Sequence, residues 1–374
     1  MTPTTDFLAP ARLGRLTLPH HLVMAPLTRN RAAPDGTPTD LMVTHYAQRA
    51  SAGLIIGEAS TPNAVGQTYP NITAIHTDRH VEGWRRVTEA VRAGGGRMFL
   101  QLQHGGRVSH PATTGLHPVA PSPVPLPEPI FTPAGHQPAV VPREMTPDDI
   151  RATVTDFATA ARRAVAAGFE GVEVHSANGH LLHQFLAGNS NRRTDVYGGS
   201  VEHRVRFTAE VTEAVADAIG ADRVGVRISP ASTVNGVRED DTDLLYPALV
   251  ARLKGLAYLH VVHADPAAGW YRRIRADWPG TLIGNPVLPG LTTRDVTRAA
   301  HGMLAAGADL VALGRPFLAN PDLVERLRRA APLNPVRDRY LMYVGGADGY
   351  TDYPALGGQP SSSERVALDG PRVV

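Results

Sequence analysis

Two hydrogen-bonding side chains, His175 and Asn178, stand three residues apart where a short valine-containing run ends. Both are neutral hydrogen-bond donors near pH 7, so together they could hold a carbonyl, nitro or phenolate oxygen on which negative charge develops. The run before them, 171–174, is typical of a buried strand, and the apolar run after them, 181–186, is typical of a helix or turn. Catalytic residues of (β/α) barrels follow strands in this way. The pattern therefore predicts an oxyanion site at a strand end.

Short β-like runs alternate with helix-like runs along most of the chain. This alternation predicts an α/β fold, a single (β/α)8 TIM barrel whose parallel strands are joined by crossover helices. The strands are expected at residues 22–25, 54–58, 98–102, 171–174, 224–228, 258–262, 281–283 and 310–313. The helices are expected at residues 40–52, 81–93, 147–167, 201–219, 241–253, 271–278, 292–306 and 320–329.

Two segments fall outside this alternation. Residues 111–147, after the third strand, are rich in proline, with prolines at alternate positions from 121 to 129, which excludes an ordinary helix or a central strand. We interpret the segment as a lid over the barrel mouth, with a disordered insertion as the alternative. The chain after residue 330 is irregular, and residues 357–374 are expected to form a disordered tail. Residues 1–356 are thus predicted to be one domain.

Composition excludes several classes of chemistry. The chain has no cysteine, which removes disulfides, thiol nucleophiles, cysteine zinc sites and iron–sulfur clusters, and no metal site is expected. The only lysine, Lys254, lies at the expected end of a helix, which argues against Schiff-base, pyridoxal and P-loop chemistry. No Gly-x-Gly-x-x-Gly follows a strand, so a nicotinamide would have to visit a site made of loops.

Charge and hydropathy indicate the expected surroundings of the protein. The formal net charge is +2 and no dense basic stripe with interleaved aromatic residues is present, so nucleic-acid binding is not expected. The first ten residues lack the basic start and apolar core of a signal peptide, and no apolar run is long enough to cross a bilayer. The sequence predicts a cytoplasmic protein without a membrane partner.

The other expected strand ends carry hydrogen-bonding residues and glycines. Glycine lets the backbone approach phosphate oxygens, and arginine offers them paired donors, so Gly314 and Arg315 indicate a phosphate site after the last strand. The candidate ligand contacts at the strand ends are Pro26, Thr28, Ala59, Gln101, Arg227, Gly284, Asn285, Gly314 and Arg315.

Longer motifs carry a resemblance to a known family. The run His175-Ser-Ala-Asn178 is followed by Leu-Leu-x-Gln-Phe-Leu at 181–186 and by Arg-Thr-Asp-x-Tyr-Gly-Gly-Ser at 193–200. Together these motifs resemble the Old Yellow Enzyme family of FMN-dependent ene-reductases, and the resemblance extends over residues 7–354. It implies FMN as the cofactor and NADPH or NADH as the reductant.

The resemblance also implies roles for individual positions. Thr28 would tune the carbonyl edge of the flavin, and Ala59 and Gln101 would contact its ring. Arg227 would lie against the pyrimidine part and stabilise the anion of the reduced flavin. The remaining flavin contact is Pro26, the phosphate end is implied at Gly284, Asn285, Gly314 and Arg315, and the substrate face is implied at Thr28, Tyr69, His175, Asn178 and Tyr343.

The implied reaction is a ping-pong hydride transfer. NADPH or NADH would reduce the flavin and leave, and an activated alkene would then bind over the same flavin face. The alkene is an α,β-unsaturated carbonyl or nitro compound whose oxygen is held by His175 and Asn178. This makes its β-carbon the acceptor of the hydride, and a proton must then reach the α-carbon.

Three positions depart from the family pattern. His180 stands where most members have the tyrosine that supplies this proton, so the proton is expected from His180 or from water, or the step is expected to be slow. Gln103 stands where many members have tryptophan, which should change the shape of the substrate site. Pro286 has no amide proton to offer to a phosphate.

Two other functions stay open on the sequence. An FMN-dependent quinone or nitro-compound reductase that does not protonate alkenes is also compatible with His180. A non-redox, phosphate-binding TIM-barrel isomerase or lyase would explain Gly314 and Arg315, but not the joint set at the other strand ends. The expected partner is a small-molecule substrate with an activated alkene, and the expected state is a monomer or homodimer.

Overall fold

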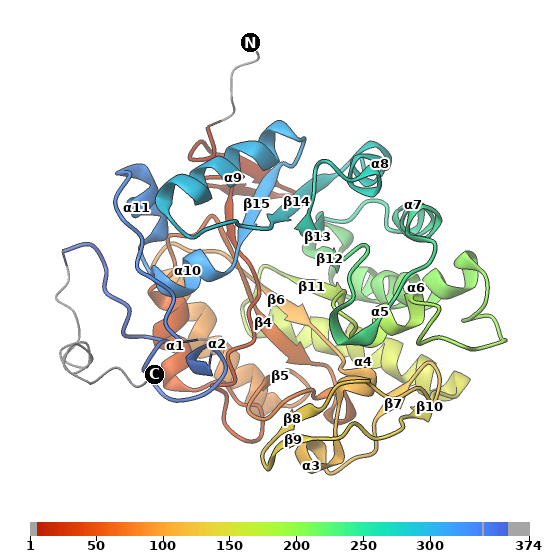
Figure 1. The fold of residues 1–374 in the computed structure, drawn as a ribbon. Helices are drawn as coiled ribbons and strands as arrows, with labels where there is room; N and C mark the ends of the chain where they lie inside the picture. Colours follow the sequence, from red (N-terminus) through yellow and green to blue (C-terminus); the bar gives the residue numbers. More distant parts are fainter. Residues whose placement is uncertain (1–5, 339, 358–374) are drawn as a thin grey trace, which may run out of the picture.

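The computed structural model describes residues 6–338 and 340–357, within which eight parallel strands close into a barrel surrounded by helices (Figure 1). The last strand of the barrel pairs with the first, which closes the sheet on itself. The (β/α)8 TIM barrel expected from the sequence is confirmed. The barrel strands are β3 (Leu22–Met24), β4 (Leu54–Thr61), β6 (Met98–Leu102), β11 (Gly171–Ser176), β12 (Val224–Ile228), β13 (Tyr258–Ala264), β14 (Thr281–Pro286) and β15 (Leu310–Leu313).

The helices lie outside the barrel, and local chemistry explains where they begin. Helix α4 (Pro147–Ala166) starts with a reciprocal cap, because the Asp149 amide donates to the Thr146 hydroxyl and the Thr146 amide donates to the Asp149 carboxylate. The other helices are α1 (Asp40–Ala47), α2 (Asp78–Ala93), α5 (Leu181–Leu186), α6 (Val201–Ile219), α7 (Thr242–Arg252), α8 (Gly269–Asp277), α9 (Thr293–Ala305), α10 (Arg315–Ala319) and α11 (Leu323–Arg328). Short 3-10 turns lie at Ala64–Gly66, Gly106–Val108, Ala221–Arg223, Val234–Gly236 and Tyr340–Met342.

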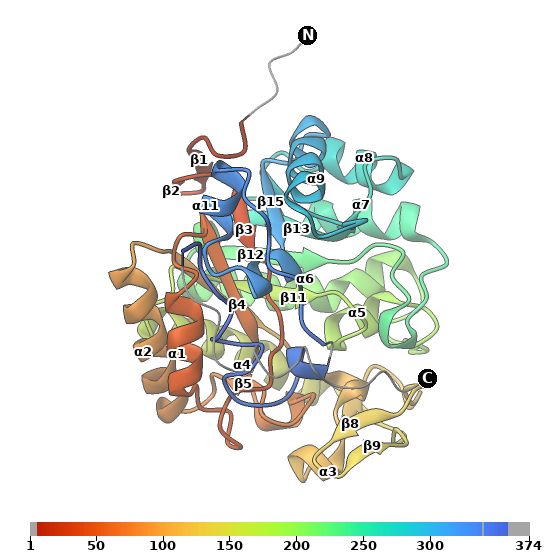
Figure 2. The same cartoon turned by 60° about the vertical axis from the view of Figure 1, so that its left-hand side comes forward.

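The observed elements differ from the expected ones in a few places. Helix α1 ends earlier than residue 52, and α2 begins earlier than residue 81 because Thr77 caps it. The expected helix 320–329 covers only α11, and the short α10 directly after β15 was not anticipated. Nor was the antiparallel hairpin of β1 (Ala11–Leu13) and β2 (Leu16–Leu18), which closes the amino end of the barrel (Figure 2).

Side chains of the barrel strands alternate between two apolar cores, because successive residues of a strand point to opposite faces. One core lies between the strands and the helices and includes Leu100. The other fills the amino end of the barrel interior and includes Phe99 and Tyr258. Two residues further along the same inward rows stand Gln101 and His260, so the interior becomes polar toward the carboxyl ends of the strands. The barrel interior therefore has an apolar floor at the amino ends of the strands and polar side chains above it.

The proline-rich segment 111–147 has short elements of its own. It contains the single-turn helix α3 (Pro111–Thr114), the antiparallel pair β8 (Ile130–Thr132) and β9 (Gly135–Gln137), and the parallel pair β7 (Val119–Ala120) and β10 (Arg143–Glu144). Figures 1 and 2 show it at the same end of the molecule as β5 (Thr73–Ala74), which extends the carboxyl end of β4. A lid would need this position, and its action as a lid stays a prediction.

The remaining expectations concern the tail and the domain. The tail expected to be disordered, 357–374, lies outside the described residues from position 358 onward. The single domain at 1–356 stays a prediction. Among the helices of the described residues, none is long and apolar enough to cross a membrane.

Gly225 in β12 tests the packing of the barrel interior. A Cβ atom there would overlap the ring of Tyr258, which packs on Phe99 with ring centroids 5.7 Å apart. We expect Gly225→Ala to lower the free energy of unfolding by about 1–3 kcal/mol, as overpacked cores do. Gly302 in α9 is the matched control, because among the described residues no atom outside the local helix backbone lies within 4 Å of its Cβ position. Gly302→Ala should therefore raise the free energy of unfolding by about 0.5–1 kcal/mol. Thermal melts of both variants measure whether the free energy of unfolding falls for Gly225→Ala and rises for Gly302→Ala. A Gly225→Ala protein as stable as the wild type would contradict this packing.

Candidate active site

The turn after β11 brings the three expected catalytic residues together. His175 is buried at the end of β11, Asn178 is half-buried, and His180 is buried just before α5. Asn178 has φ 55° and Gly179 has φ 70°, in the left-handed region that asparagine and glycine tolerate best. The turn returns His180 to the strand, so that His175 Nε2 lies 3.1 Å from His180 Nδ1.

Both imidazoles of this pair are neutral at pH 7. Burial is the main cause that lowers the pKa of His175 well below its usual value, and the nearby His180 and Arg227 add to it. Burial likewise lowers the pKa of His180 to about 4. At pH 7 about one His180 ring in a thousand therefore carries both protons. The two rings share a hydrogen bond, and neither is an imidazolium acid at neutral pH.

A buried hydrogen bond between a histidine and a carboxylate supports the turn. His183 Nδ1 accepts the Gly179 amide at 3.0 Å, so the ring proton of His183 is on Nε2, which lies 2.6 Å from Glu239 Oε1. The side chains of His183 and Glu239 are fully buried, and Tyr246 also donates its hydroxyl to Glu239. The Asn178 amide donates to the Ser229 hydroxyl at 2.8 Å. These bonds fix both left-handed residues of the turn.

Polar side chains from neighbouring strands lie beside this turn. Arg227 in β12 is only 6% exposed, and its Nη2 donates to Asn285 Oδ1 at 3.1 Å. Its Nε has no hydrogen-bond partner, and no carboxylate lies within ion-pair distance of it, in the part of the chain that the structure describes. A buried guanidinium of this kind is suited to an oxygen-bearing ligand, because an unpaired buried charge is costly. The outer nitrogens His175 Nδ1 and His180 Nε2 are buried and unpartnered as well.

The structure gives two of the expected phosphate contacts other partners. The Cβ position of Gly284 faces the side chain of Met303 at 2.6 Å, so the lack of a side chain there is explained by packing on α9. The side chain of Asn285 bonds Arg227 on one side and the carbonyl oxygen of Ala312 on the other. Arg315, by contrast, is exposed at the start of α10. Phosphate binding at these positions stays a prediction.

The remaining expected contacts lie at the same end of the barrel. Pro26 and Ala59 are buried and Thr28 is half-buried, directly after β3 or within the end of β4. Tyr69 packs on an apolar cluster of the proline-rich segment, and burial, with the nearby Tyr343 as a further cause, raises the pKa of Tyr69 to about 12. Tyr343 is 40% exposed. The shared role of Tyr69 and Tyr343 at the substrate face stays a prediction.

A C-terminal strap, residues 340–353, is tied to the barrel by two arginines that the sequence analysis missed. Arg29 donates to the carbonyl oxygen of Met342 at 2.8 Å, and Arg31 donates to that of Val344 at 2.7 Å. Further bonds from the same two guanidinium groups reach other strap carbonyls. The available signal was a pair of arginines two residues apart directly after the first strand end. Because the strap carries Tyr343, these arginines position the expected substrate face.

Aromatic contacts complete the attachment of the strap. The guanidinium carbons of Arg29 and Arg31 each lie 4.8 Å from the centroid of the Tyr350 ring, which also stacks on His45 at 4.0 Å. Glu58 in β4 accepts the Arg29 amide and the Tyr46 hydroxyl. Burial raises the pKa of Glu58 to about 7, although these hydrogen bonds and Arg29 oppose the shift.

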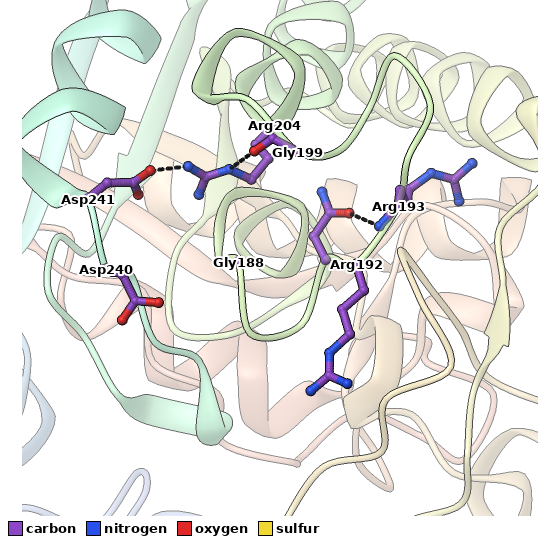
Figure 3. A pocket seen from close by; sticks show the side chains of 8 residues that line it. Gly188, Arg192, Arg193, Gly199, Arg204, Asp240 and Asp241 are labelled. Atoms are coloured by element: carbon purple, nitrogen blue, oxygen red, sulfur yellow. Dashed lines mark hydrogen bonds and ion pairs between the residues drawn. The ribbon is translucent and has the colours of Figure 1, made fainter.

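A separate polar hollow of about 310 Å³ lies beside the loop after α5 and does not include the expected site residues (Figure 3). Two of its three arginines are paired with carboxylates, since Arg204 bonds Asp241 and Arg193 bonds Asp195. Arg193 also donates to the carbonyl oxygen of Pro121 at 3.1 Å. The Arg-Thr-Asp run therefore fastens the proline-rich segment to the barrel.

Known proteins share this fold and much of this sequence. A family model described as the NADH:flavin oxidoreductase / NADH oxidase family matches residues 6–334. A Leishmania infantum protein named probable flavin mononucleotide-dependent alkene reductase is 42% identical over 368 residues, covering 93% of this chain and 97% of that protein. The old yellow enzyme homologue from Zymomonas mobilis is 36% identical, with a TM-score of 0.88 over 94% of this chain and 99% of that one. Morphinone reductase in complex with tetrahydroNAD is 43% identical, with a TM-score of 0.88 over 94% and 98%.

Glu58 should make stability depend on pH. Its pKa is raised in the folded protein, so the unfolded chain loses this proton first as pH rises, and stability falls between about pH 4.5 and pH 7. Glu58→Gln removes this effect. We compare the free energy of unfolding of Glu58→Gln with that of the wild type at each pH. The difference, variant minus wild type, should be on the order of 3 kcal/mol more positive at pH 8 than at pH 4.5. Urea unfolding at several pH values measures the difference, and a difference that is constant with pH would contradict a raised pKa.

Proposed function

The chain belongs to the NADH:flavin oxidoreductase / NADH oxidase family, and on that premise we propose that its oxyanion site is the pair His175 and Asn178. It is an FMN-dependent oxidoreductase that uses NADPH or NADH and reduces the activated C=C bond of α,β-unsaturated carbonyl or nitro compounds. The observation that supports the proposed site is the turn after β11, which carries both residues and sets His175 in register with the buried Arg227 of β12.

The residues at the strand ends fit the flavin. Bound FMN supplies the hydride that passes from the nicotinamide to the alkene. Arg227, buried with an unpartnered Nε, suits the oxygen-bearing pyrimidine edge, and Gln101 in the neighbouring inward row suits the same edge. Thr28, Ala59 and Pro26 would line the ring, and Gly314 with Arg315 would hold the phosphate.

His175 and Asn178 would bind the substrate oxygen. A ring N–H of His175 and the side-chain amide of Asn178 are neutral donors, so they stabilise an oxygen on which negative charge grows without forming a tight ion pair in the ground state. Because the turn is fixed by His183 and Ser229, the donors are oriented before substrate arrives. Tyr69 and Tyr343 would form the opposite wall.

His180 is a positioning residue in this proposal. Its Nδ1 lies within hydrogen-bond distance of His175 Nε2, so it orients the ring of His175 and sets which nitrogen carries the proton. As a neutral imidazole it is a poor acid at pH 7. We therefore assign the proton that reaches the α-carbon to solvent water.

The neutral state of His180 at pH 7 also supports a second candidate activity. Without a protonated acid at His180, quinones or nitro compounds, whose oxygens take protons directly from water, would be reduced without the slow protonation of carbon. The non-redox phosphate-binding isomerase or lyase is wrong, because the chain belongs to a flavin-dependent family. A cytoplasmic location and a monomeric or homodimeric state stay predictions.

An anaerobic absorption spectrum tests the reaction. The purified protein should show an oxidised flavin band that bleaches on addition of NADPH and recovers on addition of 2-cyclohexenone. Recovery with a quinone but not with the enone would favour the second activity. A protein that binds no flavin, even after reconstitution with FMN, would contradict the proposed function.

Variants of the turn test the roles of its residues. Replacement of His175 and Asn178 by alanine should lower the rate of enone reduction in a single turnover by about 10²–10³-fold. Replacement of His180 by phenylalanine should lower it by less than about tenfold, because water supplies the proton. The wild-type rate should also be nearly constant from pH 6 to pH 8. A rate that falls tenfold per pH unit over this range would show that the imidazolium of His180 is the acid.

A further inference from the structure

Glu173, one inward position before His175 on β11, is a fully buried carboxylate that the site described so far does not use. Its register places it opposite Gln101 of β6 on one side and Gly225 of β12 on the other. From this position Glu173 bonds His260 of β13, two strands away, and the ring of Tyr258 fills the space over Gly225. The carboxylate thus lies inside the barrel at the level of the expected flavin edge.

Each carboxylate oxygen of Glu173 receives one donor. Gln101 Nε2 lies 2.8 Å from Oε1, and His260 Nδ1 lies 2.8 Å from Oε2. Burial by itself raises the pKa of Glu173, but His260, Arg227 and Gln101 outweigh it and hold the pKa below its usual value. The group is therefore an ionised carboxylate, which only accepts hydrogen bonds.

An acceptor-only partner decides the orientation of the Gln101 amide. The NH₂ end of Gln101 must face Glu173, because two oxygens placed against each other would repel. The carbonyl oxygen of Gln101 is then left to bind a ligand. A ligand atom at this place must be an N–H donor, and the imide N–H of the flavin pyrimidine ring is such a group.

Glu173 also acts on Arg227 through charge. Burial lowers the pKa of Arg227, and the attraction of Glu173 is the main cause that opposes this shift. The carboxylate is too far away for an ion pair, so it offsets part of the guanidinium charge without occupying its donors. The positive electrostatic potential that a flavin meets at this edge is therefore smaller than the potential of Arg227 alone, because Glu173 contributes a negative potential.

We propose that Glu173 is a positioning residue of the flavin edge, which fixes the Gln101 carbonyl toward the ligand and moderates the positive charge of Arg227. It thereby sets both the affinity for FMN and the reduction potential of the bound flavin. The inference rests on the proposed function, because it requires FMN at this edge.

The test compares Glu173→Gln with Glu239→Gln. Glu239 is the matched control, because it is also a fully buried carboxylate bonded to a histidine, but it anchors the turn and contacts neither Gln101 nor Arg227. The dissociation constant of oxidised and reduced FMN is measured for each apoprotein, together with the two-electron reduction potential of the bound flavin against a reference dye.

For Glu173→Gln we expect the dissociation constant of oxidised FMN to rise about tenfold, because the Gln101 amide is no longer locked. That of reduced FMN should change less than about threefold, because the uncompensated Arg227 favours the anion. If the constant for reduced FMN is unchanged, the ratio of the two constants shifts tenfold in favour of the reduced form, which raises the two-electron potential by about 30 mV, and a threefold rise of that constant would leave about 15 mV. Glu239→Gln should leave the potential and both constants at their wild-type values.

Each other outcome is decisive. Glu173→Gln with wild-type affinity and potential, or with shifts equal to those of Glu239→Gln, would overturn the inference and leave the proposed function intact. A wild-type apoprotein that binds no FMN would overturn the proposed function itself. If Glu173→Gln does not fold, the wild type is tested with an FMN analogue methylated on the imide nitrogen, which should bind at least about tenfold more weakly than FMN. Equal binding of analogue and FMN would overturn the inference.

Discussion

The pairing of β15 with β3 is the constraint on which the rest of the protein depends. Because all barrel strands are parallel, closing the sheet brings their carboxyl ends into one ring. Residues as far apart in sequence as Thr28 and Arg315 thereby lie at the same end of the barrel. Period-2 alternation along each strand separates the inward side chains from the outward ones, and along the inward rows apolar packing residues are followed by polar residues toward the carboxyl ends. Fold and site are thus two consequences of one closed sheet.

The local part of this arrangement was predictable from sequence. Valine-rich runs marked the strands, and the capping pattern at Thr146 marked the start of α4, because both signals depend on residues close together in the chain. His175, Asn178 and His180 were found because one turn contains them. Contacts between distant segments left weaker signals. The contact of Arg29 with the strap spans more than three hundred residues, and the pair of arginines after the first strand end does not say which segment they bind.

Buried polar groups account for most of what the sequence left unassigned. Glu173 was visible as the single charged residue within a valine-rich strand, and a charge in a buried strand requires a partner. Its partners Gln101 and His260 come from other strands and could be identified only in three dimensions. Gly284 shows the opposite situation, because the sequence predicts a phosphate contact there and the structure shows that the missing side chain also makes room for Met303. Glycine at a strand end is ambiguous in sequence, because ligand approach and helix packing both require a missing side chain.

The strap is held through its main chain and through one buried side chain. Arg29 and Arg31 bind carbonyl oxygens, which every amino acid provides, and arginine can serve several of them at once from one planar group. The buried ring of Tyr350 supplies the side-chain contact, while Tyr343 between these points is 40% exposed. In evolutionary terms the exposed positions of the strap form a surface on which substrate range can drift while Tyr350 and the scaffold are maintained. In protein engineering, a library that varies Tyr343 and keeps Tyr350 would yield mostly folded members.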